Sequence, residues 1–167
     1  NQLWSISPEK KITVLAKDYK GGIVNGPNDL WPNSRNGGIY FTDPYYQRNY
    51  WEKDHHHITE QCVYYLAKNK KNPVVVASDL QRPNGIIGTP DGQTLYVADI
   101  GASKTYRYHV NKNGLLSDKQ LFVNQGSDGM TIDHKGNIYL TGKGVTVYDK
   151  NGQMIQHIAI PEDWAAN

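Results

Sequence analysis

Short runs of alternating apolar and polar residues occur along the whole chain, separated by turns rich in Gly, Asn and Asp. Runs of this kind, with β-branched and aromatic residues, predict β-strands joined by tight turns. Tyrosine is abundant, with 12 Tyr against 2 Phe, and no helical heptad pattern is visible. The pattern therefore predicts an all-β fold.

One strand–turn–strand unit occurs three times. The units open at Asn28, Asn84 and Asp128, and each reaches an equivalent Tyr after 12, 12 and 11 positions (40 − 28, 96 − 84 and 139 − 128). Successive units begin 56 and 44 residues apart (84 − 28 and 128 − 84). A period of about 40–50 residues with four strand-like runs is typical of β-propeller blades.

We therefore predict a single partial β-propeller domain over residues 1–167, covering about three and a half four-stranded blades. The predicted units are a half blade at 1–20 and full blades at 28–80, 84–124 and 128–161. A first hairpin at 2–7 and 12–16 brings the expected number of strands to 14. An unclosed propeller leaves an apolar face and strand edges exposed. The missing blades are therefore expected from the rest of a longer chain or from a partner copy.

The expected strands are stated here so that each can be compared with the structure. In the three full blades they lie near 28–31, 39–43, 62–67 and 74–78, then from 84 and at 95–100, 105–110 and 120–123, and finally from 128 and at 138–141, 145–149 and 154–160. The Asn151-Gly152 pair between the last two is the strongest hairpin signal in the chain.

A long insertion at 44–61 separates the second and third strands of the first full blade. Strand direction places this loop over the residues that open the blades. Its aromatic and histidine side chains are weak candidates for substrate contact: Tyr45, Tyr46, Trp51 and His57. The alternatives are that the aromatic residues pack the insertion down and that the histidines belong to a solvated lid.

The residues that open the three units are the candidate metal ligands of the chain. Radial blades place equivalent residues around a central channel, so oxygens of Asn28, Asn84 and Asp128 are expected to converge there. Calcium binds six to eight oxygen ligands, including amide carbonyls and carboxylates, whereas zinc prefers His and Cys. The set therefore favours calcium. The alternative is that Asn and Asp stand at these positions as turn-capping residues.

Charge and composition narrow the partners. A net charge of +2 implies neither a nucleic acid nor an anionic membrane as partner, and no apolar run approaches the length of about 20 residues that spans a bilayer. The lone Cys62 cannot form an intrachain disulfide and is expected to be a buried strand residue. The compartment stays open.

Three segments also resemble a known family. They are Gly26-Pro27-Asn28-Asp29-Leu30, Arg82-Pro83-Asn84-Gly85-Ile86 and Ser127-Asp128-Gly129-Met130, to which Leu95-Tyr96-Val97-Ala98-Asp99 can be added. They resemble the gluconolactonase family that includes senescence marker protein (regucalcin), and more distantly diisopropyl fluorophosphatase. The resemblance implies a six-bladed propeller with one divalent cation in the central channel, usually Ca²⁺, with Zn²⁺, Mn²⁺ and Mg²⁺ as alternatives. It also implies hydrolysis of sugar lactones.

The resemblance assigns roles residue by residue. Asn84 and Asp128 match metal-ligand positions, and Asn28 matches a position that touches metal or substrate. Asp128 also matches the carboxylate that serves as general base or nucleophile. Two departures stand out: the family's metal-binding Glu of the first blade has no counterpart here, and Gly26 stands where regucalcin-like members have an Arg that holds sugar hydroxyls.

Three hypotheses follow. The first is calcium-dependent hydrolysis of a small-molecule lactone, with the carbonyl polarised by the metal and Asp128 as base or nucleophile. The second is a non-enzymatic calcium-binding or interaction propeller segment, and the third is phosphotriester hydrolysis of the diisopropyl fluorophosphatase type. Resemblance to exported bacterial proteins suggests a periplasmic or secreted location, with the cytoplasm as the alternative.

Overall fold

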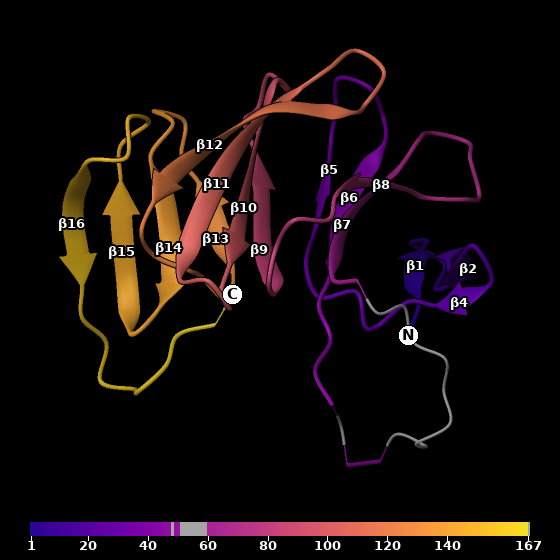
Figure 1. Cartoon of the computed structure of the whole chain (residues 1–167), viewed down its shortest axis with the longest axis horizontal. Coiled ribbons are helices and arrows are strands. Elements are labelled where there is room, and N and C mark those ends of the chain that lie inside the picture. Colours follow the sequence, from indigo (N-terminus) through magenta and orange to yellow (C-terminus); the bar gives the residue numbers. More distant parts are fainter. Residues whose placement is uncertain (48, 51–59, 167) are drawn as a thin grey trace.

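The described part of the chain consists of β-strands and turns, as expected. The computed structural model describes residues 1–47, 49–50 and 60–166, and these contain 16 strands in five antiparallel sheets and no helix. Consequently no described segment forms a helix that could cross a membrane. Three of the sheets have four strands each and stand side by side (Figure 1).

Each four-stranded sheet follows chain order from its first strand to its last, as propeller blades do. The first blade contains β5 (Leu30–Pro32), β6 (Ile39–Asp43), β7 (Cys62–Leu66) and β8 (Val74–Ala77). The second contains β9 (Pro83–Gly88), β10 (Thr94–Asp99), β11 (Lys104–Val110) and β12 (Leu116–Val123). The third contains β13 (Met130–Ile132), β14 (Ile138–Gly142), β15 (Gly144–Tyr148) and β16 (Met154–Ile158). The repeat therefore predicted all three blades.

The N-terminal region differs from the prediction. The expected hairpin is present as β1 (Leu3–Ile6) and β2 (Ile12–Ala16). A second, very short pair follows, β3 (Asp18–Tyr19) and β4 (Gly22–Ile23), which the sequence pattern did not predict. Ladders of two residues are too short to carry an apolar period, so the expected 14 strands become 16.

The blades are held together by apolar side chains, which lie on both faces of the first two four-stranded sheets and on one face of the third. Successive residues of a strand point to opposite faces, so the neighbours Tyr40 and Phe41 of β6 enter different cores. Tyr40 packs between the first two blades, where its ring centroid lies 4.6 Å from that of Tyr65. Phe41 stacks on Tyr64, at 5.2 Å between centroids, on the side of the β1–β2 hairpin. A third core, built around Tyr96, Met130 and Ile138, joins the second and third blades.

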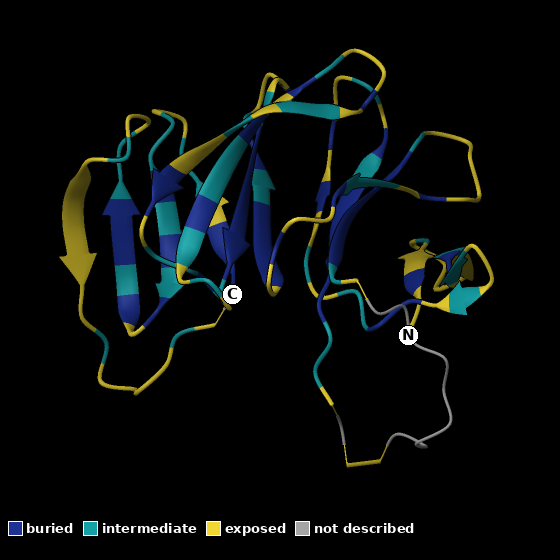
Figure 2. Cartoon of the chain, viewed as in Figure 1, coloured by how far each residue is buried: buried dark blue, intermediate teal, exposed yellow. Residues whose placement is uncertain are grey.

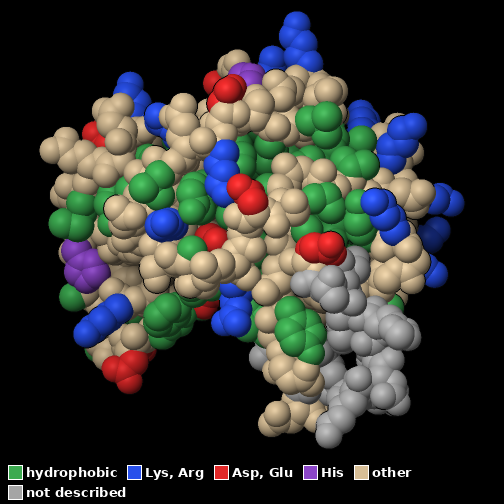
Figure 3. Space-filling model, viewed as in Figure 1, with side chains coloured by type: hydrophobic (Ala, Val, Ile, Leu, Met, Phe, Trp, Pro, Cys, Tyr) green, Lys and Arg blue, Asp and Glu red, His purple; other side chains and the backbone are tan. Residues whose placement is uncertain are grey.

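The two ends of this row of sheets expose apolar side chains. On the β1–β2 hairpin these are Trp4, Ile6, Ile12 and Val14, and on β16 they are Met154, Ile155 and Ile158. Figure 2 shows β16 as an exposed strand beside a largely buried β15. The space-filling view likewise shows apolar side chains on the surface between charged ones (Figure 3). The described residues thus fit the expectation that further blades cover these ends.

A buried carboxylate stands where β6 ends. Asp43 is 0% exposed, and its two oxygens accept hydrogen bonds from the backbone N–H groups of Asn25, at 2.9 Å, and Gly26, at 2.7 Å. Burial raises the pKa of Asp43 to about 6 although these hydrogen bonds oppose the rise. The carboxylate is therefore ionised at neutral pH and takes up a proton in mild acid.

Truncating a core side chain tests the packing between blades. Leu95 is 0% exposed between the first two blades, so Leu95→Ala should lower the free energy of unfolding by about 2–5 kcal/mol. The matched control is Leu121→Ala, because Leu121 is 49% exposed on β12 and its loss should cost less than about 1 kcal/mol. Denaturant titration measures both, and equal losses would contradict the assignment of the core.

The pKa of Asp43 predicts a pH dependence of stability. The folded protein keeps a proton on Asp43 between about pH 4 and pH 6 that the unfolded chain releases, so the free energy of unfolding falls as pH rises through this window. Relative to Asp43→Asn, the unsubstituted protein should lose about 2–3 kcal/mol between pH 4 and pH 7. Denaturant titration of both at the two pH values measures this, and a pH-independent difference would refute it.

Candidate functional site

The first strands of the three blades lie next to one another. The Asp29 Oδ2 atom, just before β5, accepts a hydrogen bond from the backbone N–H of Ile86 in β9, at 3.0 Å. On the other side of β9, a Cβ atom added to Gly85 would lie 2.7 Å from Met130 Cγ and 3.0 Å from the Asp128 carbonyl oxygen. This close approach requires glycine at position 85. The three strands begin at one edge of the molecule, the lower edge in Figure 1.

The side-chain oxygen of Asn84 has no hydrogen-bond partner in the part of the chain that the structure describes. It is 3% exposed, and its Nδ2 donates a hydrogen bond to the Tyr46 hydroxyl at 2.9 Å. Its carbonyl Oδ1 is buried and accepts no hydrogen bond from the described residues. A buried acceptor left unpaired costs about 1–3 kcal/mol. The Oδ1 atom of Asn84 is therefore a candidate ligand oxygen, because none of the described residues satisfies it.

Asp128 lies half-buried at the start of the third blade. Its Oδ2 accepts a hydrogen bond from the indole Nε1–H of Trp164 at 2.9 Å. Trp164 is held nearby because the backbone N–H of Ala165 donates a hydrogen bond to the Gly142 carbonyl oxygen. The Trp164 ring also packs on Gly142, where an added Cβ atom would lie 3.7 Å from the ring. The sequence analysis missed Trp164 as a neighbour of the site, since only the fold brings residues so far apart in sequence together.

Asp29 is a second carboxylate at this edge that the sequence analysis did not select. Burial raises its pKa, the charge of Asp128 adds to the rise, and hydrogen bonds from the N–H groups of Ile86 and Leu30 oppose it. Two carboxylates that repel each other make an environment that favours a cation. The signal in the sequence was the acidic residue directly after Asn28.

Asn28 occupies a more open position than Asn84. Its backbone N–H donates to the Thr42 carbonyl at 2.9 Å, and its side chain is exposed. It lines a cleft of about 230 Å³ together with Asp29, Trp4 and the residues Gln2, Leu3, Pro27, Leu30 and Phe41. The cleft lies between the N-terminal hairpin and the first blade.

The insertion contributes one described side chain to the site. Tyr46 reaches Asn84 through its hydroxyl, and the Arg82 guanidinium lies 5.2 Å from the centre of its ring. Tyr45 instead donates its backbone N–H to Gln61 at 2.9 Å and its hydroxyl to Gln47. Trp51 and His57 lie outside the described residues. The lower edge is hollowed between the C-terminal segment and the start of the insertion at 44–47 (Figure 3).

The donor set suits a hard cation. No three His, Cys, Asp or Glu side chains gather as a metal cluster within residues 1–47, 49–50 and 60–166. A cation at this edge would therefore need amide oxygens in addition to carboxylates. The unpartnered Oδ1 of Asn84 and the carboxylate of Asp128 are oxygen ligands of the kind that calcium accepts.

The blades and the oxygens at the start of their first strands define the chain as part of a β-propeller. Residues 2–167 match the family described as the SMP-30/gluconolactonase/LRE-like region. The chain belongs to this family, which confirms the resemblance seen in the sequence.

Relatives support this family and fold. A gluconolactonase from Zymomonas mobilis is 32% identical over 161 residues, which cover 87% of this chain and 45% of the relative. The solved structure of a gluconolactonase from Xanthomonas campestris superposes with a TM-score of 0.78 at 30% identity, over 94% of this chain and 55% of that one. Regucalcin from Agrobacterium tumefaciens, described as a calcium-binding protein, shares the fold with a TM-score of 0.74 at 23% identity, over 94% and 53%. The chain thus spans about half the length of these relatives.

Proposed function

We propose that the protein containing this chain hydrolyses a small-molecule lactone at a divalent cation, most simply Ca²⁺, bound at the edge where the first strands begin. The observation that carries the proposal is the buried Oδ1 of Asn84, which has no partner among the described residues. The next residue, Gly85, packs against the backbone of Asp128. Membership of a family with gluconolactonases supports the substrate class.

In this proposal Asn84, Asp128 and Asn28 hold the cation through their side-chain oxygens. A cation bound there would polarise the lactone carbonyl and stabilise the negative charge that develops on its oxygen. Tyr46 fixes the Asn84 amide by accepting its Nδ2–H, so that the oxygen and not the nitrogen faces the ligand. Asn28 lines the open cleft beside the N-terminal hairpin, and contact with the substrate is the alternative role that we propose for it.

Asp128 carries the proton transfer. Trp164 holds its Oδ2, so Oδ1 is the oxygen that takes a proton from an attacking water molecule. The water oxygen adds to the carbonyl carbon, the ring C–O bond breaks, and the proton passes to the ring oxygen to give the open hydroxy acid. Direct attack of the Asp128 carboxylate on the carbonyl, followed by hydrolysis of the resulting anhydride, gives the same product. Both routes require an ionised Asp128.

The substrate sits in the hollow at this edge. The Tyr46 ring, with Arg82 near its face, forms one described wall, and Trp164 forms another on the side of the third blade. An aromatic face packs well against the C–H groups of a sugar-like ring. Tyr45, Trp51 and His57 remain weaker candidates for substrate contact.

Removing the carboxylate charge tests this function. In the complete protein, Asp128→Asn should lower kcat for glucono-lactone hydrolysis by about 10²–10⁴-fold, since a positioned general base contributes that much. A chelator should abolish the activity of the unsubstituted protein, and added Ca²⁺ should restore it. Acid release followed with a pH indicator measures each rate.

The matched control is Asp133→Asn. Asp133 accepts hydrogen bonds in the turn between β13 and β14, at the far end of β13 from Asp128. The activity of this variant should therefore stay within about twofold of that of the unsubstituted protein. Chelator-sensitive activity that survives Asp128→Asn unchanged would overturn the mechanism. Faster hydrolysis of a fluorophosphate than of any lactone would overturn the substrate class, and calcium binding without hydrolysis of either would favour a non-enzymatic role.

A further inference from the structure

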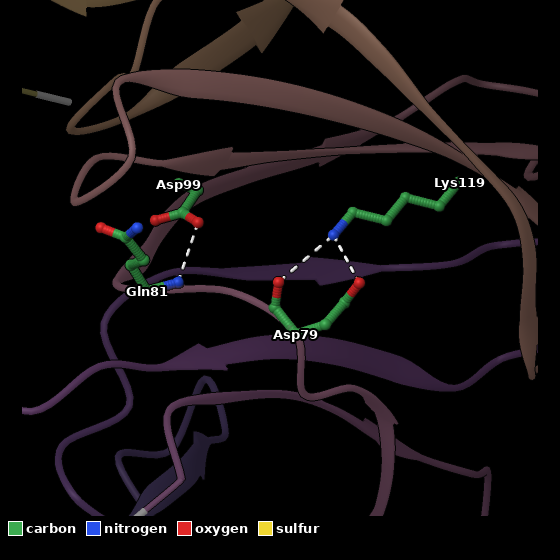
Figure 4. A network of polar contacts seen from close by, with 4 residues as sticks. All are labelled: Asp79, Gln81, Asp99 and Lys119. Carbon is green, nitrogen blue, oxygen red and sulfur yellow. Dashed lines mark hydrogen bonds and ion pairs between the residues drawn. The ribbon is translucent and has the colours of Figure 1, made fainter.

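Two buried carboxylates hold the chain just before it reaches the amide residues of the site. Asp43 ends β6 and accepts the backbone N–H groups of Asn25 and Gly26, at 2.9 and 2.7 Å. Asp99 ends β10 and accepts those of Gln81 and Arg82, both at 2.8 Å. Figure 4 shows the Asp99 carboxylate facing the Gln81 nitrogen. Each carboxylate spans two consecutive N–H groups, an arrangement we call the carboxylate clamp.

The two clamps occupy equivalent places in the repeat. Each Asp lies 15 positions after the amide residue of its own blade (43 − 28 and 99 − 84). Each clamped pair of N–H groups lies three and two positions before that amide residue (28 − 25 and 28 − 26; 84 − 81 and 84 − 82). Asp43 and Asp99 are 0% and 1% exposed. Two blades therefore use the same buried device at the same point.

A proline connects each clamp to its amide residue. Pro27 stands between Gly26 and Asn28, and Pro83 stands between Arg82 and Asn84. Proline fixes φ at about −65°, so the backbone between the clamped N–H groups and the amide has few free torsions. Fixing the connector therefore fixes the place from which the amide side chain projects.

The third blade lacks the clamp. Gly142 stands at the corresponding end of β14, and Ser127 takes the place of the proline before Asp128. Here the Ser127 hydroxyl accepts the Thr141 N–H at 2.7 Å, and the Thr141 hydroxyl accepts the Gly129 N–H at 2.8 Å. The clamp thus accompanies the two neutral amides and not the charged Asp128.

The segment at 78–83, which connects β8 to Asn84, has an additional contact. Lys119 of β12 forms an ion pair with Asp79 at 2.7 Å and also bonds to the Asp79 carbonyl at 3.3 Å (Figure 4). Its ammonium group lies 4.1 Å from the centre of the Tyr106 ring. The connector is therefore held on both sides of Leu80, which is itself buried.

We propose that Asp43 and Asp99 are positioning residues that hold the carbonyl oxygens of Asn28 and Asn84 in place for the cation without touching it. A neutral amide oxygen attracts a cation more weakly than a carboxylate does, so its contribution depends on being placed correctly beforehand. The charged acceptors strengthen the hydrogen bonds that provide this placement. The inference rests on the proposed function, because it assumes that these amides bind a cation.

The test measures calcium affinity of the complete protein by calorimetry, together with kcat and KM. Asp43→Asn and Asp99→Asn each keep the side-chain shape but remove the charge and one acceptor. Each should weaken calcium binding at least tenfold, while kcat at saturating calcium stays within about threefold because Asp128 is untouched. Asp99→Ala should weaken binding further than Asp99→Asn.

Asp149→Asn is the matched control. The Asp149 carboxylate also accepts two backbone N–H groups, those of Asn151 and Gln153, both at 2.9 Å. It does so in the turn between β15 and β16, at the opposite edge from the site (Figure 1). The control should lose stability without losing calcium affinity.

A second pair of variants covers the case in which a clamp variant does not fold. Pro27→Ala leaves the carboxylate in place but frees the backbone between Gly26 and Asn28, and it should weaken calcium binding about threefold to tenfold. Its control is Pro90→Ala, in an exposed turn between β9 and β10. An affinity unchanged in Pro27→Ala would count against the inference.

The outcomes separate this inference from the proposed function. If Asn84→Ala abolishes calcium binding while the clamp variants bind as well as Asp149→Asn, the inference is wrong and the proposed function stands. If Asn84→Ala itself binds calcium normally, the proposed cation site is wrong and the inference fails with it. Loss of affinity in both clamp variants, with kcat recovered at saturating calcium, supports the inference.

Discussion

The buried carbonyl oxygen of Asn84 is the constraint on which the rest of this site depends. The Tyr46 hydroxyl holds the amide nitrogen, and the oxygen receives nothing from the described residues. A fold does not normally leave a buried acceptor unpaired, because the cost is not recovered. Burial raises the pKa of the neighbouring Asp29, and the charge of Asp128 adds to the rise, which is a second unfavourable interaction at the same edge. The proposed divalent cation would relieve both.

The blades explain how three separate segments reach this edge. Neighbouring sheets pack through apolar residues such as Tyr40, Leu95 and Tyr96. Packing alone leaves the first strands free to shift, and specific polar contacts remove that freedom. The Thr42 hydroxyl donates a hydrogen bond to the backbone carbonyl oxygen of Asn84 at 2.7 Å, and the Asp29 carboxylate accepts one from the backbone N–H of Ile86. Glycine at position 85 lets the second and third blades approach closely. The apolar cores therefore determine how the blades pack, and these polar contacts determine where the first strands lie at the site.

Much of the fold could be predicted because its strands belong to a simple repeat. The apolar alternation and the Asn-Gly turns gave β6 with the same limits as the structure, and the other blade strands nearly so. β12 begins at Leu116, four residues before the predicted start, because Ser117, Asp118 and Lys119 are polar and carry no strand pattern. The ladder of β3 and β4 is too short to be seen in any pattern.

The candidate site was predictable only where the repeat marks it. Phase along the repeat selected Asn28, Asn84 and Asp128, and family membership is consistent with that choice. Trp164 and Asp29 were missed because their roles depend on contacts between blades, which no local pattern records. In the sequence, Asp43 and Asp99 stand at or next to the ends of predicted strands and carry no further signal. Their burial and the backbone N–H groups that their carboxylates accept distinguish them in the fold. The sequence therefore selected the candidate ligands more readily than the residues proposed to position them.

The central claim is that Asn84 and Asp128 share a cation. The most direct measurement is a crystal structure of the complete protein soaked with a lanthanide as a calcium substitute, with the ion located by anomalous scattering. The account predicts an ion at roughly 2.3–2.6 Å from both the Asn84 Oδ1 and the Asp128 carboxylate. A fully occupied ion elsewhere, with Asn84 Oδ1 bonded to a protein group or a water molecule alone, would contradict it.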